Sequence, residues 1–210
     1  MSAEETRRAA RRYMQGWRLS IIPVPKAAKN PGRDGWQHER HTPDEIPQLW
    51  REDLGIGCLW GKPSNNYCDV DCDWVEAARA ADHILPRTRS FGHPAAPKSH
   101  RIICVTDDLP KTKRYLVPGK EPGRMVVELL STGAQSLLPP SWYSNGTRRQ
   151  WFAEGTSARM GGQELREAVA DIAAAAWLAR NWPGEGARHD YAKAAAGYVL
   201  RIFPASVAYG

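Results

Sequence analysis

The chain has 210 residues, 42% of them hydrophobic, which is enough to bury the core of one domain with a small appendage. Its 29 Lys and Arg outnumber its 23 Asp and Glu, and the net charge of +6 favours polyanionic partners. No apolar run approaches the ~20 residues of a membrane-spanning helix, and the Arg-rich N-terminus lacks the apolar core of a signal peptide. These features exclude a membrane-embedded protein and predict a cytoplasmic one.

The N-terminus is expected to form a helix with one basic face. Ser2 and Glu5 have the spacing of a capping box, and four arginines follow within the next turns: Arg7, Arg8, Arg11 and Arg12. This face is a candidate contact for nucleic acid, but a run of charges on a helix is also typical of a plain solvated surface. A strand over Trp17–Val24 and an irregular basic loop over 26–36 are expected next.

The residues before and after position 67 predict ordinary structural elements. A strand near 57–60, a turn over 63–66 and the strand that begins at Tyr67 have the pattern of a hairpin, and 74–85 has the periodicity of a helix. The four cysteines, at 58, 68, 72 and 104, lack the paired spacing of a zinc site. They are expected to be reduced core residues.

An acidic pair lies in the stretch Tyr67–Asp73, whose pattern predicts a buried strand. Because successive strand side chains point to opposite faces, Asp69 and Asp71 project side by side from one face. Two carboxylates so close repel each other, and a divalent cation relieves that repulsion. Paired oxygen ligands without a thiolate or imidazole cluster suit Mg²⁺ or Mn²⁺. The alternative is a pair of solvated acids in an exposed loop or at a strand end.

A second polar cluster lies where the short apolar strand Arg101–Val105 begins. It consists of Lys98, Ser99, His100 and Arg101. The hydroxyl, the two cationic groups and an imidazole N–H can all donate hydrogen bonds to anionic oxygens. The cluster is therefore a candidate phosphate contact, although similar clusters also occur on plain surfaces.

The apolar run Met125–Leu130 predicts another strand and carries one acid, Glu128. A lone carboxylate in such a run is costly to bury unless it is paired or bound to a metal. Glu128 is therefore the natural third ligand beside Asp69 and Asp71. A salt bridge between Glu128 and a nearby Arg is the alternative.

Beyond residue 161 the composition changes to Ala-rich helix, which divides the chain into a main domain, 1–160, and a small helical segment, 161–210. Residues of one apolar face recur there at helical spacing: Leu165, Val169, Ile172 and Ala176. Two short helices bury little alone, so they are expected to pack on the main domain or to join a larger helical bundle. Arg188 is a candidate contact for template or nucleotide, or else a solvated charge where the second helix begins.

The order of the motifs is more specific than any one of them. The acid-x-acid strand is followed by Ser99-His100 before a strand, and then by a strand acid, a Gly and Gln turn and Pro139-Pro140-Ser141. Over 17–146 this order resembles the archaeo-eukaryotic primase superfamily, in particular its bifunctional DNA primase/polymerase (prim-pol) branch, found largely on plasmids, phages and prophages. The resemblance implies an α+β fold, with a modified RRM-like antiparallel sheet and flanking helices as the catalytic domain, 1–160, and 161–210 as an accessory segment.

The resemblance also implies roles for the motif residues. Asp69 and Asp71 match the family's first motif and, with Glu128 as the third, would bind two Mg²⁺ or Mn²⁺ ions. His100, with Ser99, matches the second motif and would contact the phosphates of the incoming nucleotide. The expected catalytic residues are therefore Asp69, Asp71, His100 and Glu128.

A wider set of residues is expected to bind the nucleotide. Lys29 lies in a Lys, Pro, Gly segment similar to the front segment of the family, and Gln135 belongs to the turn after the third motif. Lys98 and Arg101 are assigned from their charge and position. The expected nucleotide-binding residues are Lys29, Lys98, Ser99, His100, Arg101 and Gln135.

Three hypotheses from different classes follow. The first is template-dependent nucleotidyl transfer by a DNA primase or DNA polymerase with two metal ions. Its expected partners are a single-stranded DNA template and primer, deoxy- or ribonucleoside triphosphates, and a helicase in the same system. The second is a Mn²⁺-dependent glycosyltransferase that uses the acid-x-acid motif, which leaves Glu128 and the Ser99-His100 pair unexplained. The third is a non-catalytic module that binds single-stranded nucleic acid during replication.

Overall fold

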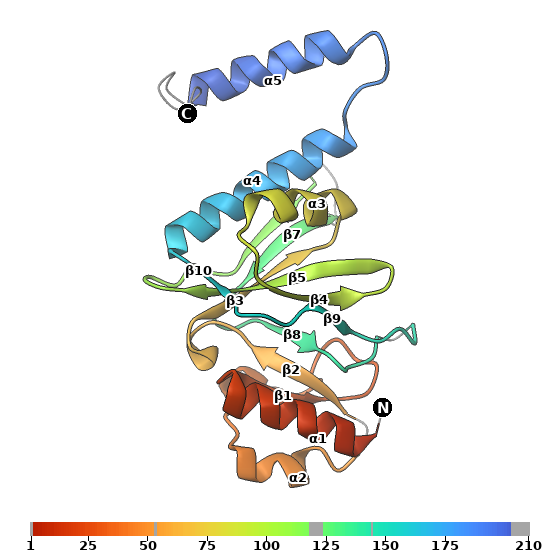
Figure 1. The fold of residues 1–210 in the computed structure, drawn as a ribbon, viewed down its shortest axis with the longest axis vertical. Helices are drawn as coiled ribbons and strands as arrows, with labels where there is room; N and C mark the ends of the chain where they lie inside the picture. Colours follow the sequence, from red (N-terminus) through yellow and green to blue (C-terminus); the bar gives the residue numbers. More distant parts are fainter. Residues whose placement is uncertain (1, 53, 118–123, 144, 203–210) are drawn as a thin grey trace.

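The computed structural model describes the backbone of residues 2–52, 54–117, 124–143 and 145–202, and the side chains up to residue 197 within these ranges. It has a mixed α+β fold in which antiparallel sheets lie between helices (Figure 1), which confirms the expected fold class. The helices are α1 (Ala3–Arg11), α2 (Ile46–Leu49), α3 (Val75–Ile84), α4 (Gly162–Arg180) and α5 (Arg188–Ile202), with shorter turns η1 (Arg12–Gly16), η2 (Trp36–His38), η3 (Pro43–Glu45) and η4 (Lys62–Ser64). The strands are β1 (Ser20–Val24), β2 (Gly55–Leu59), β3 (Tyr67–Cys72), β4 (Arg89–His93), β5 (Ala96–Val105), β6 (Lys113–Leu116), β7 (Met125–Leu130), β8 (Gln135–Leu138), β9 (Gln150–Ala153) and β10 (Ala158–Met160).

The larger sheet is centred on the acidic strand. In the described part of the chain its order is β6-β7-β3-β5-β4-β9, with every neighbour antiparallel, and β10 pairs in parallel with the end of β5. Asp71 lies opposite His100 on β5 and opposite Glu128 on β7. Directly opposed residues share a face of the sheet, so the register brings the three sequence motifs together.

The smaller sheet has the order β1-β2-β8 and corrects one expectation. The strand near 57–60 does not form a hairpin with the acidic strand beyond a single antiparallel bridge between Gly61 and Tyr67, because β5 and β7 pair with the two edges of β3. Between β2 and β3 the chain passes through η4 and then through Asn65 and Asn66, which have left-handed backbones with φ of 49° and 63°. This turn carries the chain from one sheet to the other.

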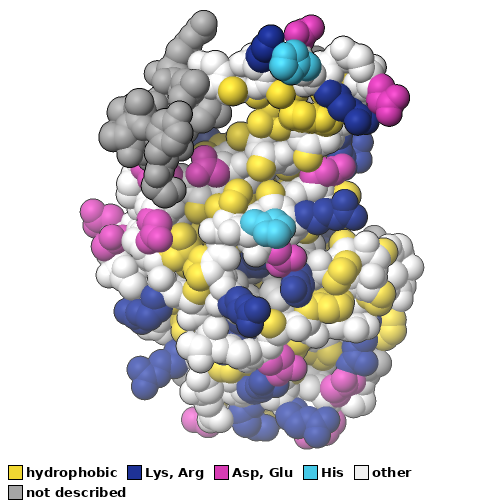
Figure 2. Space-filling model, turned by 45° about the horizontal axis from the view of Figure 1, so that its top comes forward, with side chains coloured by type: hydrophobic (Ala, Val, Ile, Leu, Met, Phe, Trp, Pro, Cys, Tyr) yellow, Lys and Arg dark blue, Asp and Glu magenta, His cyan; other side chains and the backbone are white. Residues whose placement is uncertain are grey.

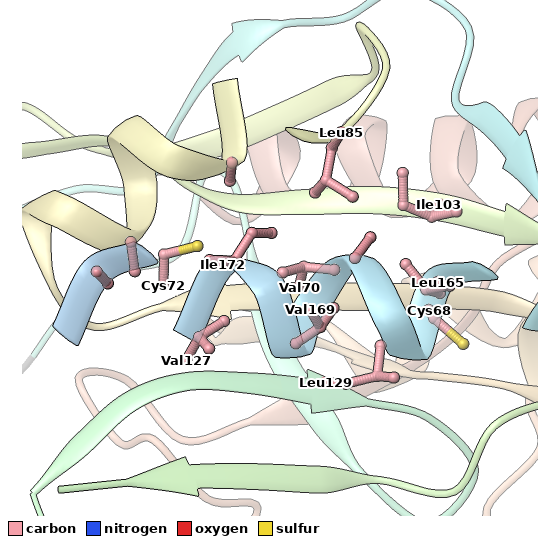
Figure 3. Close-up of a cluster of buried hydrophobic side chains, with 14 of the residues drawn as sticks. Cys68, Val70, Cys72, Leu85, Ile103, Val127, Leu129, Leu165, Val169 and Ile172 are labelled. Atoms are coloured by element: carbon pink, nitrogen blue, oxygen red, sulfur yellow. The ribbon is translucent and has the colours of Figure 1, made fainter. Parts of the chain in front are cut away.

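The main core lies between the larger sheet and two helices, α3 and α4, which cover the same face (Figures 1 and 3). Alternation along β3 sends Cys68, Val70 and Cys72 into this core, whereas Asp69 and Asp71 project from the other face. All four cysteines are free and buried, which confirms the expectation of reduced core residues. The opposite face of the sheet is covered by the smaller sheet and α1 around a second cluster that includes Trp50, Trp60 and Phe91.

The two C-terminal helices differ in how they pack. In α4 the residues Leu165, Val169, Ile172 and Ala176 are buried in the main core, so this helix packs on the main domain, one of the two placements expected. None of the described side chains of α5 is buried, and the end of the expected accessory segment, 203–210, lies outside the described residues.

On one face of the molecule (Figure 2), charged side chains of both signs are interspersed rather than gathered in one patch. Figure 2 shows one face on which Lys and Arg side chains are spread among Asp and Glu side chains. Among the described helices, none is long and apolar enough to cross a membrane.

Candidate active site

The polar face of β3 opens into a pocket of about 580 Å³. This volume falls within the range of ~300–1,000 Å³ typical of small-molecule sites. The wall is formed by the larger sheet, by β8 and the turn before it, and by the segment that contains Lys29 and Trp36. Six of the residues expected from the sequence line it: Lys29, Asp71, Ser99, His100, Glu128 and Gln135.

His100 lies in the pocket wall with polar partners on both sides. Its side chain is 3% exposed and stacks on Phe91, with ring centroids 4.4 Å apart. Nδ1 lies 2.8 Å from Oδ2 of Asp69, and Nε2 lies 2.7 Å from Nη1 of Arg149. A guanidinium can only donate, so Nε2 accepts and the ring proton is on Nδ1, which donates to Asp69. The imidazole is therefore neutral and fixed in orientation.

Asp69 is completely buried beneath the pocket. Its Oδ2 accepts hydrogen bonds from His100 and from Oγ of Ser136, each at 2.8 Å. Its Oδ1 is buried and has no hydrogen-bond partner among the described residues. A buried carboxylate oxygen without a partner is costly, so this atom is suited to a further ligand.

Asp71 lies closer to the opening, with 27% of its side-chain surface exposed. Burial raises its pKa to about 6. Its Oδ1 lies 3.4 Å from Nε2 of His100. The nearby charge of Asp69 raises the pKa further. The charged form of this carboxylate is therefore less favourable here than in water, and a nearby cation would compensate its charge.

Glu128 faces Asp71 across the strands but is already paired. Its Oε1 accepts a hydrogen bond of 2.6 Å from Nε of Arg114 on β6, which is the salt bridge that the sequence left open as an alternative. Within the described residues, no group of three or more His, Cys, Asp and Glu side chains is arranged to hold a metal ion. The backbone thus brings the three acids to one face, while Glu128 points its carboxylate to Arg114.

Arg149 is a pocket residue that the sequence analysis missed. It is 7% exposed, and its guanidinium lies 4.4 Å from the ring centroid of Tyr143. Its backbone N–H donates to Ser141, while its Nε has no hydrogen-bond partner among the described residues, and burial lowers its pKa. Arg149 lies beyond the matched motifs, directly before β9, so no local pattern distinguishes it from the neighbouring Arg148.

Two expected nucleotide contacts are corrected by the structure. Arg101 follows His100 on the strand and therefore points to the opposite face, where its guanidinium donates to the backbone oxygens of Ala78 and Lys98 and to Asp82. Lys98 is exposed, and its Nζ lies 3.6 Å from the same Asp82 carboxylate. Both cations lie beside α3, and neither lines the pocket.

Gln135 lines the pocket, as expected, and its side chain joins two parts of the pocket wall. Gln135 donates from Nε2 to the backbone oxygen of Lys29 at 2.7 Å, which links the front segment to β8.

The arginines proposed for nucleic acid all lie outside this pocket. Arg7 donates to the Trp50 backbone and Arg12 pairs with Glu154. The side chains of Arg8, Arg11 and Arg188 are exposed, and their contact with nucleic acid stays a prediction.

The fold and the pocket define a class of protein. Carboxylates suited to hard divalent cations, together with a buried arginine suited to phosphate oxygens, converge on one face of an antiparallel sheet. The chain is thus an α+β domain with a polar pocket lined by both acidic and basic side chains.

The family follows from comparison with known sequences. The model of the family described as bifunctional DNA primase/polymerase, N-terminal (Prim-Pol), matches residues 10–175. The chain belongs to this family, as its motifs indicated, and membership implies a primase or polymerase of the nucleotidyltransferase type, with nucleic acid and nucleotides as substrates. A search among curated proteins finds no match.

Proposed function

We propose that the chain catalyses template-dependent nucleotidyl transfer, as a DNA primase or DNA polymerase in replication of the plasmid, phage or prophage type. The observation that carries the proposal is the register of β3, which places Asp71 opposite both His100 and Glu128 at the wall of a nucleotide-sized pocket. The substrates are a single-stranded DNA template, a primer and a nucleoside triphosphate.

Two divalent cations, Mg²⁺ or Mn²⁺, would be held by the three acids of the pocket once the side chain of Glu128 turns from Arg114 towards the aspartates. Asp69 offers a buried Oδ1 without a partner, Asp71 offers a carboxylate destabilised by burial, and Glu128 offers a carboxylate bound only to an exposed arginine. Oxygen donors of this kind are preferred by hard cations. Bound cations would supply the charge that activates the primer 3′-hydroxyl and stabilises the pyrophosphate leaving group.

The remaining pocket residues would bind and orient the triphosphate. Arg149 is fixed by His100 and Tyr143 with donors facing the pocket, which suits it to phosphate oxygens. His100 would then act mainly by holding Arg149, with Asp69 fixing its tautomer. Lys29 and Ser99 also line the pocket and carry hydrogen-bond donors.

The direct test is incorporation of labelled deoxy- or ribonucleotides on primed and unprimed single-stranded DNA with each metal. Asp71→Ala is expected to abolish incorporation, whereas Asp44→Ala, an exposed acid of η3, leaves it unchanged. An Asp71→Ala protein that still incorporates nucleotides would refute the assigned site. Template-independent sugar transfer would instead support a glycosyltransferase, and strand binding without incorporation would support a non-catalytic module.

The role of Arg149 has a separate test with a neighbouring control. Arg149→Lys keeps the charge but loses the planar donors, so kcat/KM for the nucleotide is expected to fall by about a hundredfold. Arg148→Lys changes an arginine one position away that lies outside the pocket, and is expected to have little effect. Equal effects of the two changes on a stably folded protein would contradict a contact between Arg149 and phosphate.

A further inference from the structure

A second pocket, of about 310 Å³, lies at the opposite end of β3. Tyr67 lines it, and the four strand positions from Tyr67 to Asp71 span about 13 Å. Its wall includes Trp17, Arg18, Tyr67, Arg89, Cys104 and Arg159, none of which lines the candidate active site. The two pockets are therefore separate.

The charge of this second pocket is entirely positive. Three arginines line it, and no Asp or Glu lies among its described lining residues. Within the described part of the chain, Arg18 and Arg159 form no ion pair, although both are exposed. Arg18 is held by a left-handed backbone, φ 54°, and by a 2.7 Å hydrogen bond from Asn65 to its carbonyl oxygen.

Arg89 forms the buried floor of the second pocket. It is 7% exposed, its guanidinium lies 3.5 Å from the ring centroid of Trp17, and its Nε donates to the Gly155 oxygen at 3.1 Å. Burial lowers the pKa of Arg89, whereas the nearby carboxylate of Glu154 raises it. That carboxylate is itself paired with Arg12, at 2.5 Å. A buried cation without a carboxylate of its own is costly, and an anionic ligand would offset that cost.

We propose that Arg18, Arg89 and Arg159 form a second anion site that binds a phosphate group. Guanidinium groups present planar, paired donors that match the oxygens of phosphate, and three of them supply enough charge for a phosphate dianion. The phosphate comes either from a nucleic-acid strand or from a free phosphate or nucleotide. The assignment of a nucleic-acid strand as the source rests on the proposed polymerase function. The existence of the anion site does not depend on that function.

A row of aromatic rings fixes the second site relative to the first. Phe91 stacks on His100, and Trp151 contacts Phe91 and Trp17 edge to face, with ring centroids 5.2 and 5.0 Å apart. Arg89 then stacks on Trp17. A strand phosphate held here would therefore keep a constant distance from the reacting centre.

The test measures binding of three probes by the full chain: inorganic phosphate, a deoxynucleoside triphosphate, and single-stranded oligonucleotides with and without a 5′-phosphate. Arg18→Gln/Arg159→Gln changes only exposed side chains, and is expected to weaken binding of the phosphate-bearing probe by about tenfold at low salt and to reduce its salt dependence. Arg79→Gln, an exposed arginine on α3, is the matched control. Arg89→Gln is added, with its melting temperature measured to establish that it folds.

The outcomes separate the sources and the two proposals. Loss of inorganic phosphate binding identifies a free-anion site, and loss confined to oligonucleotides identifies a strand site; either supports the inference. Affinities for all probes equal to those of Arg79→Gln overturn it. If the wild-type chain incorporates no nucleotides while the double variant still loses phosphate binding, the polymerase proposal fails and the anion site stands.

Discussion

At the scale of single residues, the pocket is organised by what each carboxylate touches. Asp69 is bound to His100 and Ser136 and holds the imidazole, whereas Asp71 lies nearer the opening and carries the shifted pKa. Glu128 is bound to an arginine whose side chain is 66% exposed. The three acids on this face therefore differ in their hydrogen-bond partners and in their exposure before any substrate binds.

Glu128 can be a metal ligand or merely a salt-bridge partner, and two variants separate these roles. An exposed ion pair contributes less than about 1 kcal/mol to stability, so Arg114→Gln is expected to leave the melting temperature nearly unchanged. Glu128→Gln is expected to weaken Mn²⁺ binding, measured by calorimetry, whereas Arg114→Gln, which frees the carboxylate, keeps or strengthens it. Identical Mn²⁺ affinities in both variants and the wild type would leave Glu128 with only the structural role.

The raised pKa of Asp71 predicts that the stability of the metal-free protein depends on pH. Burial raises its pKa from 3.8 to about 6, so the folded chain holds its proton more tightly than the unfolded chain. The stability that this group contributes is present below about pH 4 and is lost as the pH rises through about 6. Asp71→Asn is therefore expected to melt at a higher temperature than the wild type above about pH 6, with the advantage vanishing near pH 4. Thermal melts with a chelator measure the difference, and a constant offset across this range would contradict the assignment.

At the scale of elements, the rule that was most predictive was alternation along strands. It placed Asp69 and Asp71 on one face and Cys68 in the core, as the structure has them. By the same rule, the adjacent residues His100 and Arg101 point to opposite faces of the sheet. The expectation that Arg101 contacts phosphate beside His100 did not take this into account. Local pattern predicted which face a side chain takes, but not which strands pair.

Strand pairing and the pocket's arginine depend on contacts far apart in the sequence. The hairpin expected before Tyr67 is reduced to one bridge, between Gly61 and Tyr67, because β5 and β7 pair with the two edges of β3. The sequence around Tyr67 does not contain that information. Arg149 reaches His100 from 49 positions away. Such residues could not be identified from spacing, because only the assembled sheet brings them into the pocket.

Helix α4 illustrates how a periodic face becomes part of the core. Leu165 is completely buried against the sheet, so Leu165→Ala is expected to cost ~2–5 kcal/mol of the free energy of unfolding. Asp171→Ala, on the exposed side of the same helix, is the control and is expected to change it by less than about 0.5 kcal/mol. Chemical denaturation measures both, and a similar small loss for Leu165→Ala would mean that α4 does not belong to the core.

At the scale of the whole molecule, the family match and the packing agree on where the domain ends. The matched region, 10–175, includes most of α4, and the main core contains residues of α4 up to Ala176. The sequence-based division at 161 separates this helix from the sheet that it covers. The structural unit therefore extends through α4, while α5 contributes no buried described side chain.

Truncation tests this extent directly. A chain ending after Trp182 keeps every described residue of the main core and is expected to fold cooperatively, with a melting temperature within a few degrees of the full chain. A chain ending at 160 loses α4 and exposes the apolar face of β3 and β7 that it covers, so it is expected to aggregate or to melt without cooperativity. Circular dichroism and size-exclusion chromatography compare the two. A stable, monomeric chain 1–160 would restore the earlier boundary, because its sheet would then need no cover from α4.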